Sequence, residues 1–359
     1  MVYPERRKAK GRPAIASFLT RGRLSDGNTL AACLFSLSLA SYILAPLAYS
    51  ETFFPPGRHK ITFKSSYDST SQTAYIIVPQ SAKRSSAAFP VVVALHTWSA
   101  NVEQRDMYGE LERQAQKRGW LYLFPDFRGA NNHPLACGSN AACRDVIDAL
   151  EWTVAHFAVD SNRVYLAGMS GGGYMAMLLA ARYPRQWTAV SAWVGISDLT
   201  SWYAMHAHRQ YGDDMRRCFG GAPESGPDIR AKYESRSPLA SLAIARNVPF
   251  DFAAGRDDGH GNNPVPIRQT LAAFNAIARA QGADTVSDQE TAQLSTYGGR
   301  LSAPHSDDTA QDPVFARRIF LRRFAGNTRV TIFNGGHEWI PAAAAEWLGN
   351  HVGRAPGGK

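Results

Sequence analysis

The sequence predicts an α/β fold built on a mostly parallel, doubly wound sheet. Continuous apolar and β-branched runs, such as residues 89–95, are typical of strands buried on both faces. Segments of helical length separate these runs, as the crossovers between parallel strands require. Because such crossovers are right-handed, we expect helices on both faces of the sheet.

Each strand has its own local evidence. Residues 59–64 and 73–78 have strand patterns and flank turn residues at Tyr67-Asp68-Ser69, which predicts a hairpin. Short apolar runs bounded by turns or helical segments predict the other strands. These runs cover residues 89–95, 120–125, 163–167, 188–195, 249–254 and 329–333.

Helical patterns lie between the strands. They cover residues 104–118, 141–158, 172–182, 265–281 and 342–348. Two stretches break the alternation and are interpreted as insertions, at about residues 200–245 and 283–324. The second runs into a hairpin that turns at Gly326-Asn327. We therefore expect one domain over residues 51–359 with two insertions.

The composition fits a globular α/β domain. The chain has 359 residues, of which 45% are hydrophobic and 19% charged, so it is long enough to bury a large core. The formal net charge is +9, and the first 50 residues carry +5 of it. The remaining residues contain no basic stripe interleaved with aromatic side chains, so we do not expect nucleic acid as a partner.

The N-terminus has the pattern of an export signal. A basic region precedes an apolar segment at residues 30–48, and the small residues of Ala48-Tyr49-Ser50 predict cleavage before Glu51. Residues 1–50 are thus expected to direct a secreted or periplasmic protein. The alternative is an uncleaved membrane anchor, because the apolar run is near spanning length.

Three cysteines follow the predicted cleavage site: Cys137, Cys143 and Cys218. Export permits one disulfide among them and leaves one thiol over. Cys137–Cys143 is the local pairing, whereas Cys137–Cys218 would join two loops at the same edge of the sheet. No histidine lies at zinc-ligand spacing from these cysteines, so we expect no metal site.

The clearest chemical signal lies at residues 163–184. A β-type run leads into Gly168-Met169-Ser170-Gly171-Gly172, and a helix-forming run follows at once. This is a G-x-S-x-G motif in the strand–turn–helix context that exposes a serine Oγ at the sheet edge. The motif predicts that Ser170 is a nucleophile. The alternative is a glycine-rich loop before a packing helix.

A serine nucleophile needs a base and an orienting acid, which follow it along the chain in the order acid, then histidine. His337 lies in a glycine-rich loop between the last strand and the last helix, and is the expected base. Two adjacent aspartates, Asp257 and Asp258, follow a predicted strand. Because adjacent residues point in different directions, only one of them can face His337. The G-x-x-D spacing from Gly255 makes Asp258 the expected acid and Asp257 its competitor. Asp198, which follows another strand, is a third candidate whose alternative role is to cap a helix.

The oxyanion hole needs two backbone N–H donors. Gly171, directly after the nucleophile, supplies the first. The loop after residues 89–95 is expected to supply the second, from Trp98 or, as second choice, from Thr97. Nothing in the sequence indicates a cofactor.

Over roughly residues 59–350, these motifs resemble the α/β-hydrolase superfamily, in particular its prolyl-oligopeptidase-like and secreted esterase or polyester-depolymerase branch. The resemblance implies an α/β-hydrolase fold. The chain departs from the branch at His96-Thr97-Trp98, where such enzymes usually have His-Gly. The matching pieces are Asp160-x-x-Arg163-Val164-Tyr165 before GMSGGG, the loop led by His96, Gly255-x-x-Asp258 with Val265-Pro266, and Gly336-His337-Glu338.

The expected activity is hydrolysis of carboxylic esters through an acyl-enzyme. The expected substrates are acyl or methyl esters on polysaccharides, or a short-chain polyester. Trp98, Trp202 and Tyr203 are interpreted as substrate-binding aromatics at a mouth that the insertions partly cover; packing is their alternative role. The membrane is a partner only if the N-terminal segment is uncleaved.

The competing function is a serine peptidase of the prolyl-oligopeptidase type. Such peptidases add a large N-terminal propeller. The sequence has only about forty residues between the predicted cleavage site and Phe89, which we interpret as too few for one. A non-catalytic binding protein is disfavoured by the combination of Ser170, Asp258 and His337.

Overall fold

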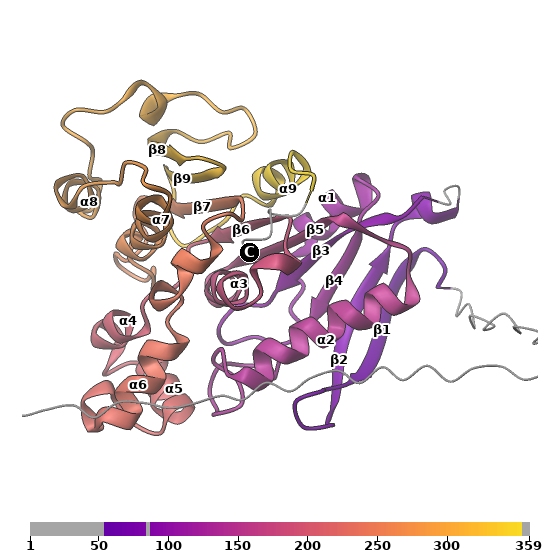
Figure 1. Cartoon of the computed structure of the whole chain (residues 1–359). Coiled ribbons are helices and arrows are strands. Elements are labelled where there is room, and N and C mark those ends of the chain that lie inside the picture. The colour runs from indigo at the N-terminus through magenta and orange to yellow at the C-terminus, as the bar shows by residue number, and fades with distance from the viewer. Residues whose placement is uncertain (1–53, 84–86, 354–359) are drawn as a thin grey trace, which may run out of the picture. The chain divides into compact units, whose positions relative to one another are not determined.

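A nine-stranded sheet organises the part of the chain that the computed structural model describes, residues 54–83 and 87–353 (Figure 1). Its strands are β1 (Gly57–Lys64), β2 (Ser71–Val78), β3 (Phe89–Leu95), β4 (Leu121–Pro125), β5 (Val159–Met169), β6 (Ala189–Trp193), β7 (Phe250–Gly255), β8 (Ile319–Ala325) and β9 (Thr328–Phe333). They lie in the order β1-β2-β4-β3-β5-β6-β7-β9-β8. The pairings from β4 to β9 are parallel, and those of β1, β2 and β8 are antiparallel. The mostly parallel α/β sheet is thus confirmed.

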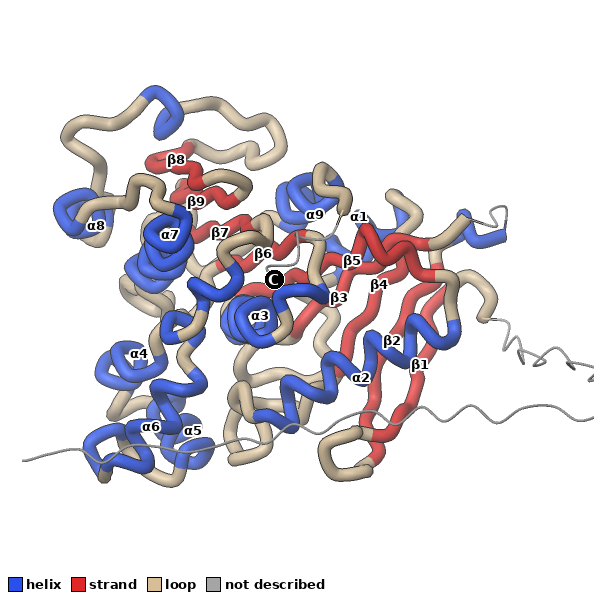
Figure 2. The backbone as a smooth tube through the Cα atoms, in the orientation of Figure 1, coloured by secondary structure: helices blue, strands red, loops and turns tan. Residues whose placement is uncertain are grey.

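Helices cover both faces of this sheet (Figures 1 and 2). They are α1 (Gly109–Lys117), α2 (Asn140–His156), α3 (Gly171–Arg182), α4 (Leu199–His206), α5 (Gln210–Phe219), α6 (Pro227–Arg236), α7 (Ile267–Gln281), α8 (Asp288–Leu294) and α9 (Pro341–Gly349). Helices α1 and α9 pack together on one face, whereas α2, α3 and α7 lie on the other. Among these described helices, none combines the length and the apolar character needed to cross a membrane.

The strand predictions hold because the central strands are apolar on both faces. Every residue of β4, β6 and β7 is buried, which explains their uninterrupted apolar sequence. One helix differs from its prediction: α1 begins at Gly109, not at residue 104. The preceding residues form turns, and the Gln104 side chain bonds Thr97 instead of facing a helix groove. The predicted export segment, residues 1–50, lies outside the described residues.

The two predicted insertions have different structures. Residues 200–245 contain most of α4 together with α5 and α6, and residues 283–324 contain α8, a long loop and most of β8. The expected hairpin is present, with Ala325 opposite Thr328 across β8 and β9. Gly326 adopts a φ of 51° at its turn, a conformation that glycine reaches without strain.

A disulfide joins Cys137 to Cys218. The two Cα atoms are 6.2 Å apart although 81 positions separate the residues along the chain. Of the two pairings left open by the sequence, the long-range one is therefore the one formed. It fixes the helical insertion, through the end of α5, to the loop that precedes α2. Cys143 is a buried free thiol, and burial raises its pKa.

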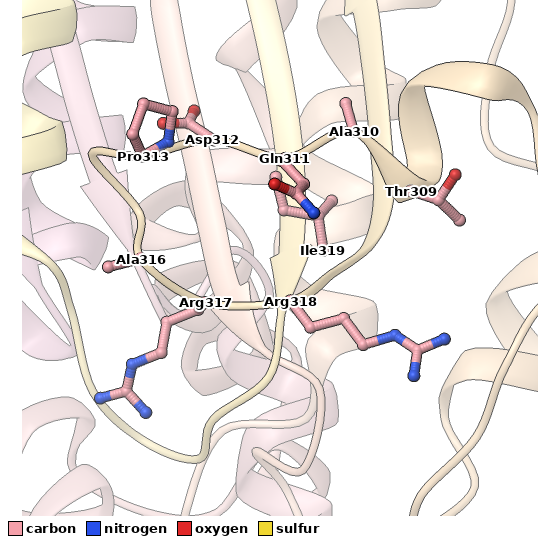
Figure 3. A pocket seen from close by; sticks show the side chains of 9 residues that line it. All are labelled: Thr309, Ala310, Gln311, Asp312, Pro313, Ala316, Arg317, Arg318 and Ile319. Atoms are coloured by element: carbon pink, nitrogen blue, oxygen red, sulfur yellow. The ribbon is translucent and has the colours of Figure 1, made fainter.

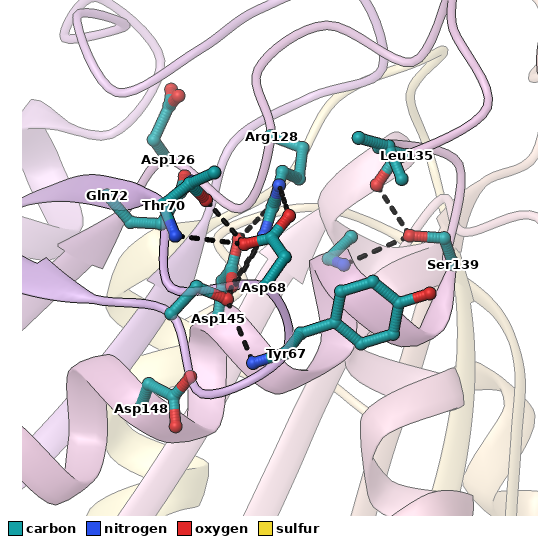
Figure 4. A network of polar contacts seen from close by, with 12 residues as sticks. Tyr67, Asp68, Thr70, Gln72, Asp126, Arg128, Leu135, Ser139, Asp145 and Asp148 are labelled. Carbon is teal, nitrogen blue, oxygen red and sulfur yellow. Dashed lines mark hydrogen bonds and ion pairs between the residues drawn. The ribbon is translucent and has the colours of Figure 1, made fainter.

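A buried ion-pair network ties the β1–β2 hairpin to α2 (Figure 4). The Arg128 guanidinium contacts the carboxylates of Asp68 at 2.8 Å and Asp145 at 2.5 Å. Asp145 is fully buried and also accepts a hydrogen bond from Ser65. Burial raises the pKa of Asp145, and the neighbouring Arg128 opposes this shift. Arg128 is therefore the cation that compensates the burial of the Asp145 carboxylate.

Replacing Arg128 with methionine is expected to lower the free energy of unfolding by about 3–5 kcal/mol at pH 7, because an uncompensated charge is left at Asp145. Without Arg128, the pKa of Asp145 in the folded protein lies still further above its value in the unfolded protein. Folding is consequently penalised as the pH rises, so the deficit should shrink toward pH 4. Urea unfolding of both proteins between pH 4 and pH 7 measures this loss in the free energy of unfolding.

Arg113→Met is the matched control, since Arg113 forms an exposed pair with Glu110 and should change stability little. A deficit in Arg128→Met that is equal at pH 7 and pH 4 would contradict the assignment of the loss to Asp145.

Candidate active site

Ser170 occupies a strained turn between β5 and α3. Its φ of 56° and ψ of −121° are unfavourable for a residue with a Cβ atom, at a cost of about 1–3 kcal/mol. The neighbouring glycines have no room for a side chain, since a Cβ at Gly171 would collide with the backbone of Trp98 and one at Gly172 with the carbonyl of Leu95. The turn is thus pressed against the loop that follows β3, with the N-terminus of α3 directly beside Ser170.

His337 and Asp258 are joined by a hydrogen bond between two loops. The Nδ1–H of His337 donates to Oδ2 of Asp258 over 2.8 Å. Asp258 is 1% exposed and also accepts the backbone N–H groups of Gly259 and Val265. Burial raises the pKa of Asp258, and the bond to His337 opposes that shift. This arrangement leaves the other ring nitrogen of His337, Nε2, as a proton acceptor.

The two competing aspartates have other partners. Asp257 forms a two-bond ion pair with Arg256, which holds the pKa of Asp257 below its usual range. Asp198 accepts the backbone N–H groups of Thr200 and Ser201 and caps α4, the alternative role that the sequence suggested. Of the three carboxylates, the structure therefore brings Asp258 to His337.

A short series of contacts links the His337 loop to the Ser170 turn. Trp339 donates its indole N–H to the carbonyl of Met107 and packs against the ring of Tyr108, with ring centroids 4.9 Å apart. The Tyr108 hydroxyl in turn donates to Leu95 and accepts the backbone N–H of Met169. Within the described residues, the Ser170 hydroxyl makes no hydrogen bond; such bonds often tighten only when substrate is present.

The backbone contacts favour Trp98 over Thr97 as the second oxyanion donor. The Thr97 N–H already donates to Gln104 over 2.9 Å. The Trp98 N–H has no acceptor among the described residues, and its nitrogen borders Gly171. Two N–H groups can thus converge on one oxygen, at the positive end of α3.

The three predicted substrate aromatics are buried. Trp98 and Trp202 are each 1% exposed and lie 4.9 Å apart between ring centroids, and Tyr203 is 6% exposed against Tyr233. Their ring faces are therefore covered by protein rather than open to a sugar. This corrects the interpretation that these side chains stack on a sugar ring. The aromatic residues of α4 pack between the helical insertion and the sheet domain, and they are buried for that reason.

Asn263 is a site residue that the sequence did not single out. Its side-chain carbonyl accepts the His337 backbone N–H over 3.1 Å, and its amide donates to the backbone carbonyls of Asp257 and His260. One side chain thus connects the acid loop to the base loop. The only advance signal was its position, a few residues after the predicted acid.

Asn263→Ala is expected to lower kcat by about 10–100-fold with little change in KM, because a small displacement of His337 is costly in a positioned site. Steady-state kinetics on a soluble ester, with a thermal unfolding curve for each variant, measure this. Asn262→Ala, which alters the exposed neighbouring asparagine, is the control. An equal loss in both variants would show that the loop as a whole, not the Asn263 bridge, matters.

The described residues include no cluster of three or more histidine, cysteine, aspartate or glutamate side chains placed to hold a metal ion.

The prolyl oligopeptidase family model matches residues 111–287, a segment that includes Ser170 and Asp258. The chain belongs to the prolyl oligopeptidase family of α/β-hydrolases. An acylaminoacyl peptidase solved with Z-Gly-Gly-Phe-chloromethyl ketone has the same fold, with a TM-score of 0.56 and 16% identity over 84% of this chain and 43% of that one. His337, the predicted base, lies beyond the segment that the family model matches.

Curated relatives of this family member include esterases. It is 23% identical over 170 residues to acetylxylan esterase A of Emericella nidulans, covering 45% of this chain and 55% of that protein. It is 25% identical over 144 residues to feruloyl esterase B of Neurospora crassa, covering 38% and 43%. The matches thus span about half the length of these curated relatives.

Proposed function

We propose that this family member is a serine hydrolase of carboxylic esters carried by polysaccharides. Ser170 is the nucleophile, His337 the general base and Asp258 the orienting acid. The backbone N–H groups of Gly171 and Trp98 form the oxyanion hole. The observation that carries the proposal is the strained φ of Ser170 at the start of α3, because such strain in a tight turn marks a functional residue.

The proposed reaction has two halves. His337 Nε2 takes the Ser170 proton as Oγ attacks the ester carbonyl, and the resulting oxyanion accepts hydrogen bonds from Gly171 and Trp98. His337 then gives the proton to the departing alcohol, which leaves an acyl-enzyme. Water, activated by the same histidine, releases the acid and restores Ser170.

The choice of ester over peptide rests on the curated relatives. Two of them are named as an acetylxylan esterase and a feruloyl esterase, and they are 23% and 25% identical to this chain over the matched residues. We further propose that the protein works outside the cytosol. The Cys137–Cys218 disulfide supports this, since such bridges persist in oxidising compartments.

A substrate panel tests the proposal. It comprises acetylated xylo-oligosaccharides, methyl ferulate, hydroxybutyrate oligomers, and acylamino and prolyl peptide nitroanilides. The kcat/KM of the best sugar-linked or feruloyl ester should exceed that of any peptide by at least about 100-fold. A peptide turned over faster than every ester would instead establish the peptidase alternative, and a preference for the oligomers would establish a polyester depolymerase.

A further inference from the structure

Three arginines gather around one phenylalanine at the edge of the sheet. Phe320, in β8, is buried, and the guanidinium carbons of Arg256, Arg318 and Arg300 lie 4.3, 5.2 and 6.0 Å from the centre of its ring. They come from three segments: the end of β7, the residue just before β8, and the loop after α8. The fold thus concentrates positive charge on a small area.

The charge of this cluster is only partly neutralised. Arg256 has its counter-ion in Asp257. Arg300 and Arg318 are exposed, and neither has an ion-pair partner or a side-chain hydrogen bond within the described residues. The contacts with the Phe320 ring offset part of the repulsion among the arginine side chains. A bound anion would stabilise Arg300 and Arg318 much more.

The cluster adjoins the proposed active site. The backbone carbonyl of Arg318 accepts the N–H of Asn334, three residues before His337. Arg317 pairs with Glu338, the residue that follows His337, over 3.2 Å. Arg317 and Arg318 also belong to the lining of a cavity of about 760 Å³ formed by residues 309–319, and their side chains extend away from the arm of the loop that carries Asp312 (Figure 3).

An exposed aromatic ring lies in the same segment. Tyr297 is 79% exposed, and the next residue, Gly298, donates its N–H to Asp257, the partner of Arg256. The rings of Tyr297 and His260 meet at an interplanar angle of 76° with their centroids 5.8 Å apart, a contact that leaves most of the Tyr297 side chain open to solvent. Tyr297 lies three residues before Arg300 along the chain. An exposed aromatic ring in the same loop as an unpaired guanidinium group suits a ligand that combines a flat apolar face with an anionic group.

We propose that Arg300, Arg318 and Tyr297 form a subsite for a sugar acid, so that the enzyme prefers esters on uronate-bearing polysaccharides. The guanidinium groups bind the carboxylate of the uronate, a geometry that arginine favours. Tyr297 stacks on its pyranose ring. This inference rests on the proposed esterase function and names the substrate class for it.

Binding is tested without turnover, in the Ser170→Ala protein. Its affinity for a glucuronate-bearing xylotetraose is compared with that for neutral xylotetraose by calorimetry, at 50 and 500 mM salt. The acidic sugar should bind at least about tenfold more tightly at low salt, and the preference should shrink at high salt because charge is screened. Adding Arg300→Gln and Arg318→Gln together should abolish the preference.

Arg246→Gln is the matched control. Arg246 is exposed and lacks an ion pair within the described part of the chain. It precedes the start of β7, whereas Arg256 follows the end of that strand. This substitution should leave the preference intact. Equal binding of the acidic and neutral sugars, or a preference that survives the double substitution, overturns the subsite. Tighter binding of a free peptide carboxylate such as Gly-Gly-Phe overturns the sugar-acid assignment.

Turnover separates this inference from the function on which it rests. In the enzyme with Ser170 intact, kcat/KM for acetylated acidic oligosaccharide should exceed that for the neutral one by about tenfold, and the ratio should fall to about one in the double variant. If no ester is hydrolysed, the proposed function fails, whereas the binding experiment still decides the subsite.

Discussion

Replacing Ser170 with alanine is expected to lower kcat/KM for ester hydrolysis by about 10⁴–10⁶-fold while the protein remains folded. The loss is large because the proposed acyl transfer begins at the Ser170 hydroxyl, so that only binding and oxyanion stabilisation remain without it. Burst kinetics with p-nitrophenyl acetate provide the readout, since the wild-type protein should release one equivalent of nitrophenol on acylation and the variant none. Retained turnover would exclude Ser170 as the nucleophile.

Ser170→Gly distinguishes a strained functional residue from a structural one. Glycine accepts a φ of 56° without the Cβ clash, so this variant should be inactive yet more stable than wild type by about 1 kcal/mol or more. Ser170→Ala keeps the Cβ and should gain no such stability. If both variants were less stable than wild type, Ser170 would have a structural role in the turn that the present contacts do not explain.

The sheet and the motif loops could be predicted because their signals are local. Buried parallel strands must be apolar throughout, and a tight strand-to-helix turn must be rich in glycine, as the collisions at Gly171 and Gly172 show. Both requirements appear in consecutive residues. The strands at 89–95 and 329–333 could therefore be placed to within a residue or so.

The features that the sequence left open or missed depend on which distant segments meet. The choice between two partners for Cys137 stayed open because Cys218 is 81 residues away, and only the packing of the insertion brings it close. Packing, the alternative role of Trp202 and Tyr203, is the one that the structure shows, because these side chains are buried where the insertion attaches to the sheet domain. Asn263 was missed for the same reason, because its side chain bridges two loops that meet only in the folded protein.

The choice between Asp258 and Asp257 gives the second large expected effect. Asp258→Asn should lower kcat by about 10⁴-fold, because an amide can donate to Nδ1 of His337 and stabilise the tautomer whose Nε2 carries the proton. That tautomer is unable to take a proton from Ser170. The shape of the side chain is nearly unchanged, so KM and the unfolding curve should change far less than kcat.

Asp257→Asn is the natural control because it makes the same chemical change one residue away. It removes a charge paired with Arg256, yet the new side-chain carbonyl still accepts the Gly298 N–H, so kcat should fall by at most a few-fold. The ratio of the two losses, about 10³ or more, is the quantity that assigns the acid. A larger loss in Asp257→Asn would mean that His337 turns toward Asp257 during catalysis, and that the hydrogen bond to Asp258 belongs to a resting arrangement only.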